Sequence, residues 1–308
     1  MSDQFDRTII QIPVVKYFAI WGKKLKVPGT EGLSFYRLLK IYVFGIIKGT
    51  FSTRASSIAF SFFIAIFPFL LFVLNLIPFV TFIEDFQQEL LSFIDELLPP
   101  QTSGFFNEIF YDIANNPRAG LLSFVFILSI FLMSNGVNAI LTSFEFSYHT
   151  NLNRSIFRQY LVAMVVAIII AILLLFTVVV TIYLTYLIED FKDLGVFIDE
   201  IYWIRIGRYA VLIGMLYIGL NVVYYFGTRE SRKSKFFSAG ALFTTILIIV
   251  TTVLFSIYIE NFASYNKLYG SIGALLILLF YIWLNSNILL LGFELNASIY
   301  KLRRIPKN

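Results

Sequence analysis

Four polar side chains that suit binding of a charged group interrupt an apolar stretch near the end of the chain. Residues 265–297 read YNKLYGSIGALLILLFYIWLNSNILLLGFELNA, and the 22 residues 272–293 carry no formal charge. At about 1.5 Å per residue, such a helix is about 33 Å long and can cross a hydrocarbon core of roughly 30 Å. Polar groups in lipid are costly unless protein or water satisfies them, so we expect this helix to face a bundle interior. The candidate polar cavity consists of Asn285, Asn287, Glu294 and Asn296.

Glu294 has two interpretations at this stage. As a structural residue, it pairs with a basic residue of an inner turn, such as Arg154, Arg158 or Arg229, and locks the bundle. As a functional residue, it lines the polar cavity and binds a cation, a proton or a lipid headgroup. Asn287 precedes Glu294 by seven residues, so the two share a helix face. For the asparagines, hydrogen bonds between helices are the structural alternative.

A second group of residues marks the predicted outer entrance of this last span. Glycine amides at a helix start present N–H donors and the positive end of the helix dipole, which suits an anionic group. Two arginines predicted on the same side of the membrane would complement such a site. The structural alternative is that the tyrosines anchor at the interface, the glycines allow close packing and the arginines balance nearby acids. This group consists of Tyr265, Tyr269, Gly270, Gly273, Arg205 and Arg208.

The composition places these residues in a membrane protein. Of the 308 residues, 58% are hydrophobic and 14% are charged, whereas soluble domains average about 25% charged residues. We therefore expect an all-α, polytopic membrane protein. The chain has no cysteine and one histidine, His149, which excludes thiolate metal sites and multi-histidine sites. We expect no metal and no cofactor.

Apolar segments of bilayer length recur six times. The first contains Pro68, a candidate hinge, because proline inside a helix removes a hydrogen bond and kinks the helix; a simple packing kink is the alternative. Around the spans we expect a basic, amphipathic cytoplasmic region over residues 1–54, an extracytoplasmic helical cap over 83–118 and a basic cytoplasmic tail over 301–308. The membrane domain covers residues 55–300, with spans at about 56–82, 120–144, 159–187, 203–226, 236–259 and 272–296.

The charges between the spans predict the orientation. Lysine and arginine are frequent before the first span, after the second, between the fourth and fifth, and in the tail, whereas the 83–118 connection has only Arg118 against seven acids. Because basic flanks stay in the cytoplasm, both termini are expected inside, in a multi-pass protein of the bacterial inner membrane. The formal charge of +5 is then explained by anionic lipid, and no nucleic-acid partner is expected.

Several of these segments resemble a known family. The most specific matches are YNKLYGSIGA at 265–274 and LLGFELNA at 290–297, and ASSIAFSFFIAIFP at 55–68 and the basic turn before a glycine-headed helix at 224–240 add to them. Together they resemble the YihY/BrkB family of bacterial inner-membrane proteins, historically mislabelled ribonuclease BN. Phe293 departs from the pattern, in which alanine is more usual, and the larger ring would disturb tight packing there. The resemblance covers roughly residues 40–300 and implies an all-helical, six-span protein with a transport or lipid-related role.

The function that these features favour is transporter-like or lipid-handling, with membrane lipids as partners and an anionic or amphipathic molecule, or a lipid, as substrate. The alternative is a structural or scaffold protein of the cell envelope, whose polar residues only join helices. Enzymatic activity is not expected, because the acids predicted on the cytoplasmic side are scattered and no known nuclease ligand spacing occurs. Self-association into a homo-oligomer is left open.

The predicted topology can be tested with reporters of compartment. A reporter fused after Arg118 should lie outside the cytoplasm and one fused after Arg232 should lie inside, because an odd number of spans separates the two positions. Activity of a periplasm-specific and a cytoplasm-specific reporter at each site measures this. Finding both sites in one compartment would contradict the span count.

Overall fold

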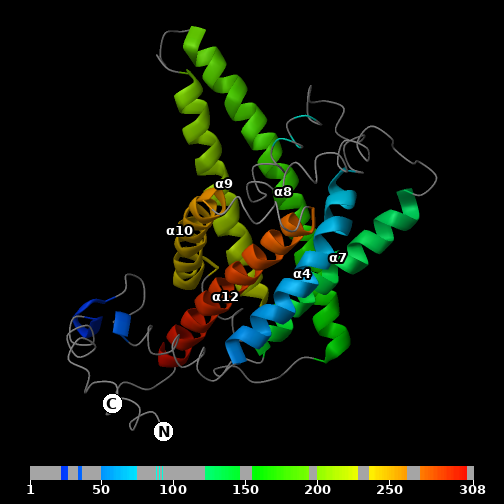
Figure 1. Ribbon diagram of the computed structural model, residues 1–308, viewed down its shortest axis with the longest axis vertical. Helices are drawn as coiled ribbons and strands as arrows, with labels where there is room; N and C mark the ends of the chain where they lie inside the picture. Colours follow the sequence, from blue (N-terminus) through cyan, green and yellow to red (C-terminus); the bar gives the residue numbers. More distant parts are fainter. Residues whose placement is uncertain are drawn as a thin grey trace.

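Six long α-helices make up nearly all of the chain that the computed structural model describes, namely residues 22–26, 34–36, 50–74, 88, 90, 92, 122–145, 155–193, 200–227, 236–261 and 271–303. The described residues contain no strand beyond an isolated bridge between Lys26 and Ser34, so the predicted all-α class is confirmed. In chain order (Figure 1) the helices are α4 (Thr50–Leu74), α7 (Leu122–Glu145), α8 (Ile156–Asp193), α9 (Glu200–Gly227), α10 (Ala239–Asn261) and α12 (Ser271–Arg303).

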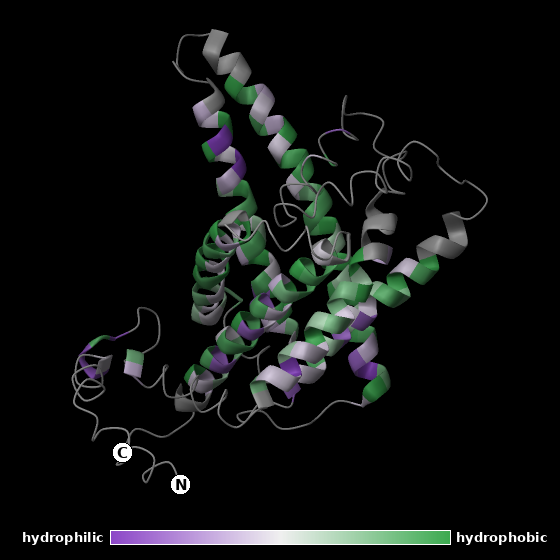
Figure 2. Cartoon of the chain, in the orientation of Figure 1, coloured by the Kyte–Doolittle hydropathy of each residue, from purple (hydrophilic) through white to green (hydrophobic). Residues whose placement is uncertain are grey.

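Five of these helices are long and apolar enough to cross a bilayer, over 127–145, 156–188, 202–227, 239–259 and 275–300. The helix α4 has 25 residues, and its described side chains from Phe51 to Ile66 form a shorter apolar segment. Hydrophobic residues colour most of α8 and α10 in Figure 2, while hydrophilic positions also occur along α12. The chain is therefore a polytopic membrane protein. The sixth span and the inward termini stay predictions.

The helices form a closed ring. Each of the six packs against its neighbour in this order, and α12 returns to pack against α4, which joins the last helix to the first. Because successive helices reverse direction, one end of the ring collects the start of α4, α8 and α10 and the end of α7, α9 and α12. We call this the inner end, since it is the end predicted to face the cytoplasm. The basic connections of the sequence leave from it.

The helix bounds differ from the predicted spans at both ends of the ring; at the outer end, α8 continues to Asp193 rather than ending near residue 187. The first helix begins at Thr50 rather than near residue 56, so Arg54, predicted to lie before the membrane domain, occupies the second turn of α4. The fifth begins at Ala239 rather than at 236, because the hydroxyl of Ser238 accepts the N–H of Ala241 at 3.2 Å and caps the helix. The predicted cap over 83–118 lies almost wholly outside the described residues, and α12 continues to Arg303.

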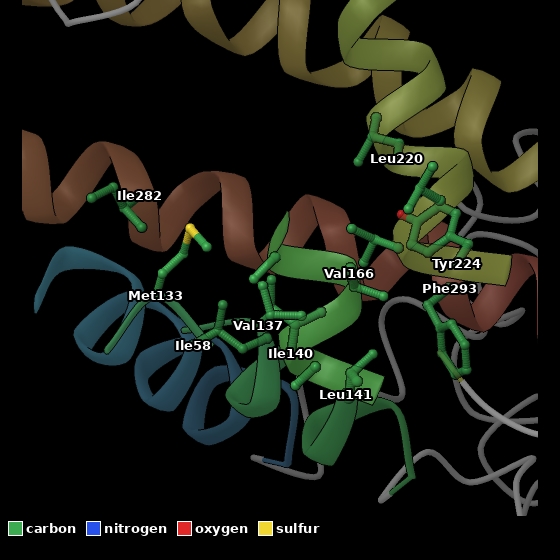
Figure 3. Close-up of a cluster of buried hydrophobic side chains, with 14 of the residues drawn as sticks. Ile58, Met133, Val137, Ile140, Leu141, Val166, Leu220, Tyr224, Ile282 and Phe293 are labelled. Carbon is green, nitrogen blue, oxygen red and sulfur yellow. The ribbon is translucent and has the colours of Figure 1, made fainter. Parts of the chain in front are cut away.

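One continuous hydrophobic cluster takes residues from all six helices and extends from their inner ends past their middles, to Ile182 of α8 and Leu278 of α12. Figure 3 shows Ile58 of α4, Met133 of α7 and Ile282 of α12 at one side of the cluster, and Tyr224 and Phe293 at the other. Phe144 of α7 stacks on Phe293 with ring centroids 4.0 Å apart and planes 4° apart. The side chain of Phe293 is only 1% exposed, so the expectation that it disturbs tight packing is wrong: the opposing Phe144 ring accommodates it.

Two glycines bring α10 and α12 into backbone contact. A Cβ atom added to Gly292 would overlap Thr244 Oγ1, the Tyr224 hydroxyl and the Gly240 carbonyl, and one added to Gly240 would overlap the Gly292 carbonyl and Asn296. Small residues allow helices in membranes to approach this closely, since association there depends on packing rather than on the hydrophobic effect. Where α10 and α12 cross, neither Gly240 nor Gly292 can therefore be replaced by a residue with a side chain without moving the helices apart.

Substituting Gly292→Ala should destabilise the folded protein. The added methyl has no space and must push α10 and α12 apart, which for overpacking costs about 1–3 kcal/mol. The melting temperature of the purified protein in detergent measures the loss.

Gly214→Ala on α9 is the matched control, because no atom lies within 4 Å of the added Cβ and alanine favours a helix over glycine. This variant should melt at or above the wild-type temperature. Equal melting temperatures for the two variants would refute the close crossing.

Candidate functional site

An ion pair at the inner end joins the first and last helices. Nη2 of Arg54 on α4 donates to Oε1 of Glu294 on α12 at 3.4 Å, and both side chains are largely buried, at 13% and 4% exposed. The other terminal nitrogen, Nη1, donates to the backbone carbonyl of Ser143 at 2.9 Å. The guanidinium carbon also lies 4.9 Å from the centre of the Phe51 ring. One arginine thus holds α4, α7 and α12 together.

This pairing corrects the expected partner of Glu294. The sequence suggested a basic residue from an inner turn, but the partner is Arg54, within the first membrane helix. Arg158 is exposed at the start of α8, and Arg154 and Arg229 lie outside the described residues. The reason is the ring: α12 packs directly against α4, and this brings an arginine one turn into α4 to the carboxylate.

Asn296 joins α12 to α9 and α10 through a satisfied network. Its Oδ1 accepts the N–H of Gly240 at 2.8 Å, and its Nδ2 donates to the Ser238 hydroxyl at 3.0 Å. Both the N–H and the hydroxyl of Ser238 donate to Oδ1 of Asn221, at 2.9 and 3.3 Å. Nδ2 of Asn221 donates to the Tyr217 carbonyl at 2.7 Å, so this fully buried side chain has partners for both of its polar atoms. Asn296 therefore forms hydrogen bonds between helices, which is the structural alternative that the sequence left open for the asparagines.

Tyr224 of α9 makes a second polar link. Its hydroxyl donates to the Leu289 carbonyl of α12 at 2.7 Å and lies 2.7 Å from Thr244 Oγ1 of α10. Because the tyrosine proton goes to the carbonyl, the threonine hydroxyl is the donor in the second bond. Because Gly292 has no side chain, both hydroxyls can approach α12. Sequence reasoning missed Tyr224, although Gly292 and Asn296, one helical turn apart, signal a close approach.

Asn285 and Asn287 behave differently from Asn296. Their amide nitrogens donate to carbonyls of their own helix, those of Tyr281 at 2.9 Å and Trp283 at 2.8 Å. Among the described residues, neither side chain forms a hydrogen bond to another helix. Oδ1 of Asn285 is buried without a hydrogen-bond partner in the described part of the chain. The structure thus separates the four predicted cavity residues: Asn296 is satisfied, Asn285 and Glu294 keep buried acceptors without partners among the described residues, and Asn287 bonds within its own helix.

Two further acceptors near the inner end are buried and unpartnered among the described residues: Oε2 of Glu294 and Oγ of Ser298. Ser298 follows Glu294 by one helical turn, so the two side chains lie on one face of α12. Native proteins rarely leave buried polar atoms without partners, and each exception calls for an explanation such as a water or an ion. Sequence reasoning missed Ser298, whose spacing from Glu294 was the available signal.

The predicted outer entrance is only partly described. Tyr265, Tyr269 and Gly270 lie outside the described residues. Gly273 is buried on α12, while Arg205 is exposed and Arg208 half-buried on the outer part of α9. The bonds that the structure records between α9 and α12 lie at the inner end, through Tyr224. The predicted grouping of this entrance therefore stays a prediction.

The candidate hinge, Pro68, lies inside α4 and is half-buried. The helix runs unbroken through it from Thr50 to Leu74, so Pro68 does not end the helix. Its role as a hinge stays a prediction.

The second helix contact with many polar groups is that of α7 with α8. Nε2 of Gln159, a buried side chain, donates to Thr142 Oγ1 at 2.6 Å and to Asn138 Oδ1 at 3.1 Å. The Tyr160 hydroxyl donates to Asn135 Oδ1 at 2.9 Å. These groups satisfy one another, which is the behaviour expected of residues that join helices. Across the described residues, no three His, Asp or Glu side chains come together as a metal-ligand set.

Comparison with known proteins places this architecture in a family. Residues 46–307 match the family described as Virulence factor BrkB. The Bacillus subtilis (strain 168) protein YfkH, whose name calls it ribonuclease-like, is 30% identical over 257 residues, which cover 82% of this chain and 92% of that protein. No solved structure matches the chain.

Two relatives are named only as membrane proteins. A UPF0761 membrane protein of Psychrobacter sp. (strain PRwf-1) is 23% identical over 86% of this chain, and the match spans 49% of its own length. A UPF0761 membrane protein of Aggregatibacter aphrophilus (strain NJ8700) is 21% identical over 81% of this chain and 87% of its own length. With most of its length matched and its helices of bilayer length, the chain belongs to the BrkB/YihY family of membrane proteins.

Proposed function

We propose that this protein is a carrier of the bacterial inner membrane that moves an anionic or amphipathic molecule, with lipids among its substrates. The observation that carries the proposal is the set of buried, unpartnered acceptors on α12, at Asn285, Glu294 and Ser298. Residues that only join helices satisfy one another, as Asn296 does. Ionisable and polar residues inside a membrane that lack this role mark pathways for substrates or ions.

The inner part of α9 is more deeply packed than its outer part, which supports a carrier that is closed at the inner end. On α9, every side chain from Leu220 to Tyr224 is buried, whereas none from Tyr202 to Gly219 is. At the inner end, the Phe144–Phe293 stack and the Arg54–Glu294 pair draw α4, α7 and α12 together. A carrier that exposes its site to one side at a time needs such a separable closure.

The chemistry of the outer part of α9 favours an anionic, amphipathic substrate. Arg205 is exposed and Arg208 half-buried, and the aromatic residues beside them, Tyr202, Trp203 and Tyr209, are 56%, 43% and 60% exposed. Figure 2 shows hydrophilic positions in the outer part of α9. Aromatic and arginine side chains together suit the interface between headgroups and acyl chains. The proposal assigns no chemical reaction to the chain; the ribonuclease-like name belongs to the Bacillus relative.

The second candidate function is a scaffold of the cell envelope. The networks around Asn221, Gln159 and Tyr224 favour it, because they bind the helices together with satisfied bonds between buried side chains. A scaffold needs no separable closure and no unpartnered acceptor. We call the Phe144–Phe293 stack and the Arg54–Glu294 pair the inner closure. The two functions differ in whether weakening this closure changes the movement of a substrate.

Weakening the closure should change lipid movement if the protein is a carrier. In vesicles that contain fluorescent phosphatidylglycerol, the wild-type protein should accelerate transfer between leaflets, measured by chemical quenching of the outer leaflet. Phe293→Ala removes one ring of the stack and should increase the rate severalfold.

Phe280→Ala is the matched control, because Phe280 lies on the same helix but is 47% exposed. This variant should keep the wild-type rate, and size-exclusion profiles check that each variant is folded. If no variant moves phosphatidylglycerol, a zwitterionic lipid or an organic anion, the scaffold function is the one to retain.

A further inference from the structure

Glu294 and Ser298 place two unused oxygen acceptors on one face of α12, one helical turn apart. Their residues are 3% and 6% exposed, and Oε2 and Oγ have no hydrogen-bond partner among the described residues. The two are one turn apart on α12 and are not bonded to each other. A buried polar atom without a partner costs about 1–3 kcal/mol, and more when it carries charge. Two such atoms on one helix face indicate a ligand.

The Arg54–Glu294 pair leaves this position open. Nη2 of Arg54 donates to Oε1 of Glu294 at 3.4 Å, and its other terminal nitrogen donates to the Ser143 carbonyl, while Oε2 has no hydrogen-bond partner among the described residues. The arginine therefore fixes the orientation of the carboxylate without covering Oε2. In this arrangement Arg54 is a positioning residue, and Oε2 is free to meet a donor or a cation.

The surroundings favour positive charge. Ser143 lies in the last turn of α7, where backbone carbonyls without helical partners form the negative end of the helix dipole. In carriers, the C-terminal ends of helices and free backbone carbonyls also coordinate cations. The charged or titratable residues on the inner parts of the described helices are Arg54 on α4, Glu145 on α7, Arg158 and Tyr160 on α8, Tyr217, Tyr224 and Tyr225 on α9, and Glu294, Tyr300, Lys301 and Arg303 on α12, with none on α10.

We propose that Glu294 and Ser298 bind a small monovalent cation such as Na⁺, K⁺ or ammonium. The ligands on α12 are Oε2 of the carboxylate and Oγ of the hydroxyl, both hard oxygen donors. Calcium takes about six to eight oxygens and usually several carboxylates, whereas this position offers one carboxylate beside an arginine. The cation site does not depend on the transport activity proposed above, so binding and lipid movement can succeed or fail separately.

Thermal unfolding of the purified protein in detergent tests the site. Chloride salts of Na⁺, K⁺, ammonium and ethanolamine are each titrated against choline chloride at constant ionic strength, so that screening stays the same. A cation that binds only the folded state raises the melting temperature with the logarithm of its concentration above Kd. The wild-type protein should show this rise with at least one small cation. A response to ethanolamine alone would identify a lipid-type ammonium group instead of an inorganic ion.

Three variants decide which residues are responsible. Glu294→Gln keeps an oxygen for Arg54 but removes the charge, and it should abolish the response; Ser298→Ala should weaken it. Ser286→Ala is the matched control, since this buried serine of α12 already donates to the Ile282 carbonyl at 2.7 Å and should leave the response unchanged. The same melting temperature in every salt, or an undiminished response in Glu294→Gln, would overturn the proposal and leave the position to water.

Discussion

The contact between the first and last helices is the constraint on which the rest of the structure depends. A carboxylate in a membrane helix cannot face lipid, so Glu294 requires α12 to turn this face toward another helix. Arg54 meets it from α4, and the same guanidinium reaches the last turn of α7. This arrangement closes the ring and determines which face of α12 is internal. Removing one partner of such a buried pair costs about 3–5 kcal/mol, because it leaves a charge without compensation.

The close contact of α10 and α12 at Gly240 and Gly292 fixes the packing of the opposite side of α12. Gly240 and Gly292 bring the backbones of α10 and α12 together. This closeness lets the Tyr224 hydroxyl, which is hydrogen-bonded to Thr244 Oγ1, donate to the Leu289 carbonyl. Packing and hydrogen bonding therefore support each other: the small residues create the approach, and the polar groups make it directional. Together with the stacked rings of Phe144 and Phe293, these contacts seal the inner end of the ring.

The polar residues of α12 divide into two physical classes, and the division bears on function. Asn296 has partners for both ends of its amide on other helices, so helix association explains it. Glu294, Ser298 and Asn285 keep buried acceptors that helix association does not use. A scaffold accounts for the first class alone, whereas a carrier with an ion site accounts for both. Membership of the BrkB/YihY family agrees with either function, because the two UPF0761 relatives are named as membrane proteins without a stated substrate.

The sequence by itself determined the class of protein, the family and the approximate helices, because bilayer thickness sets the length of apolar segments and the closing motif is specific. It also indicated Glu294 and Asn296 as residues that must turn inward, since polar groups in lipid are costly. The tertiary structure alone decided their partners. The adjacency of α4 and α12 joins positions 240 residues apart, and no local pattern encodes it. For the same reason Arg54 was assigned to the region before the membrane, Phe293 was expected to disturb packing that Phe144 in fact completes, and Ser298 went unnoticed: each depends on a neighbour that only the closed ring supplies.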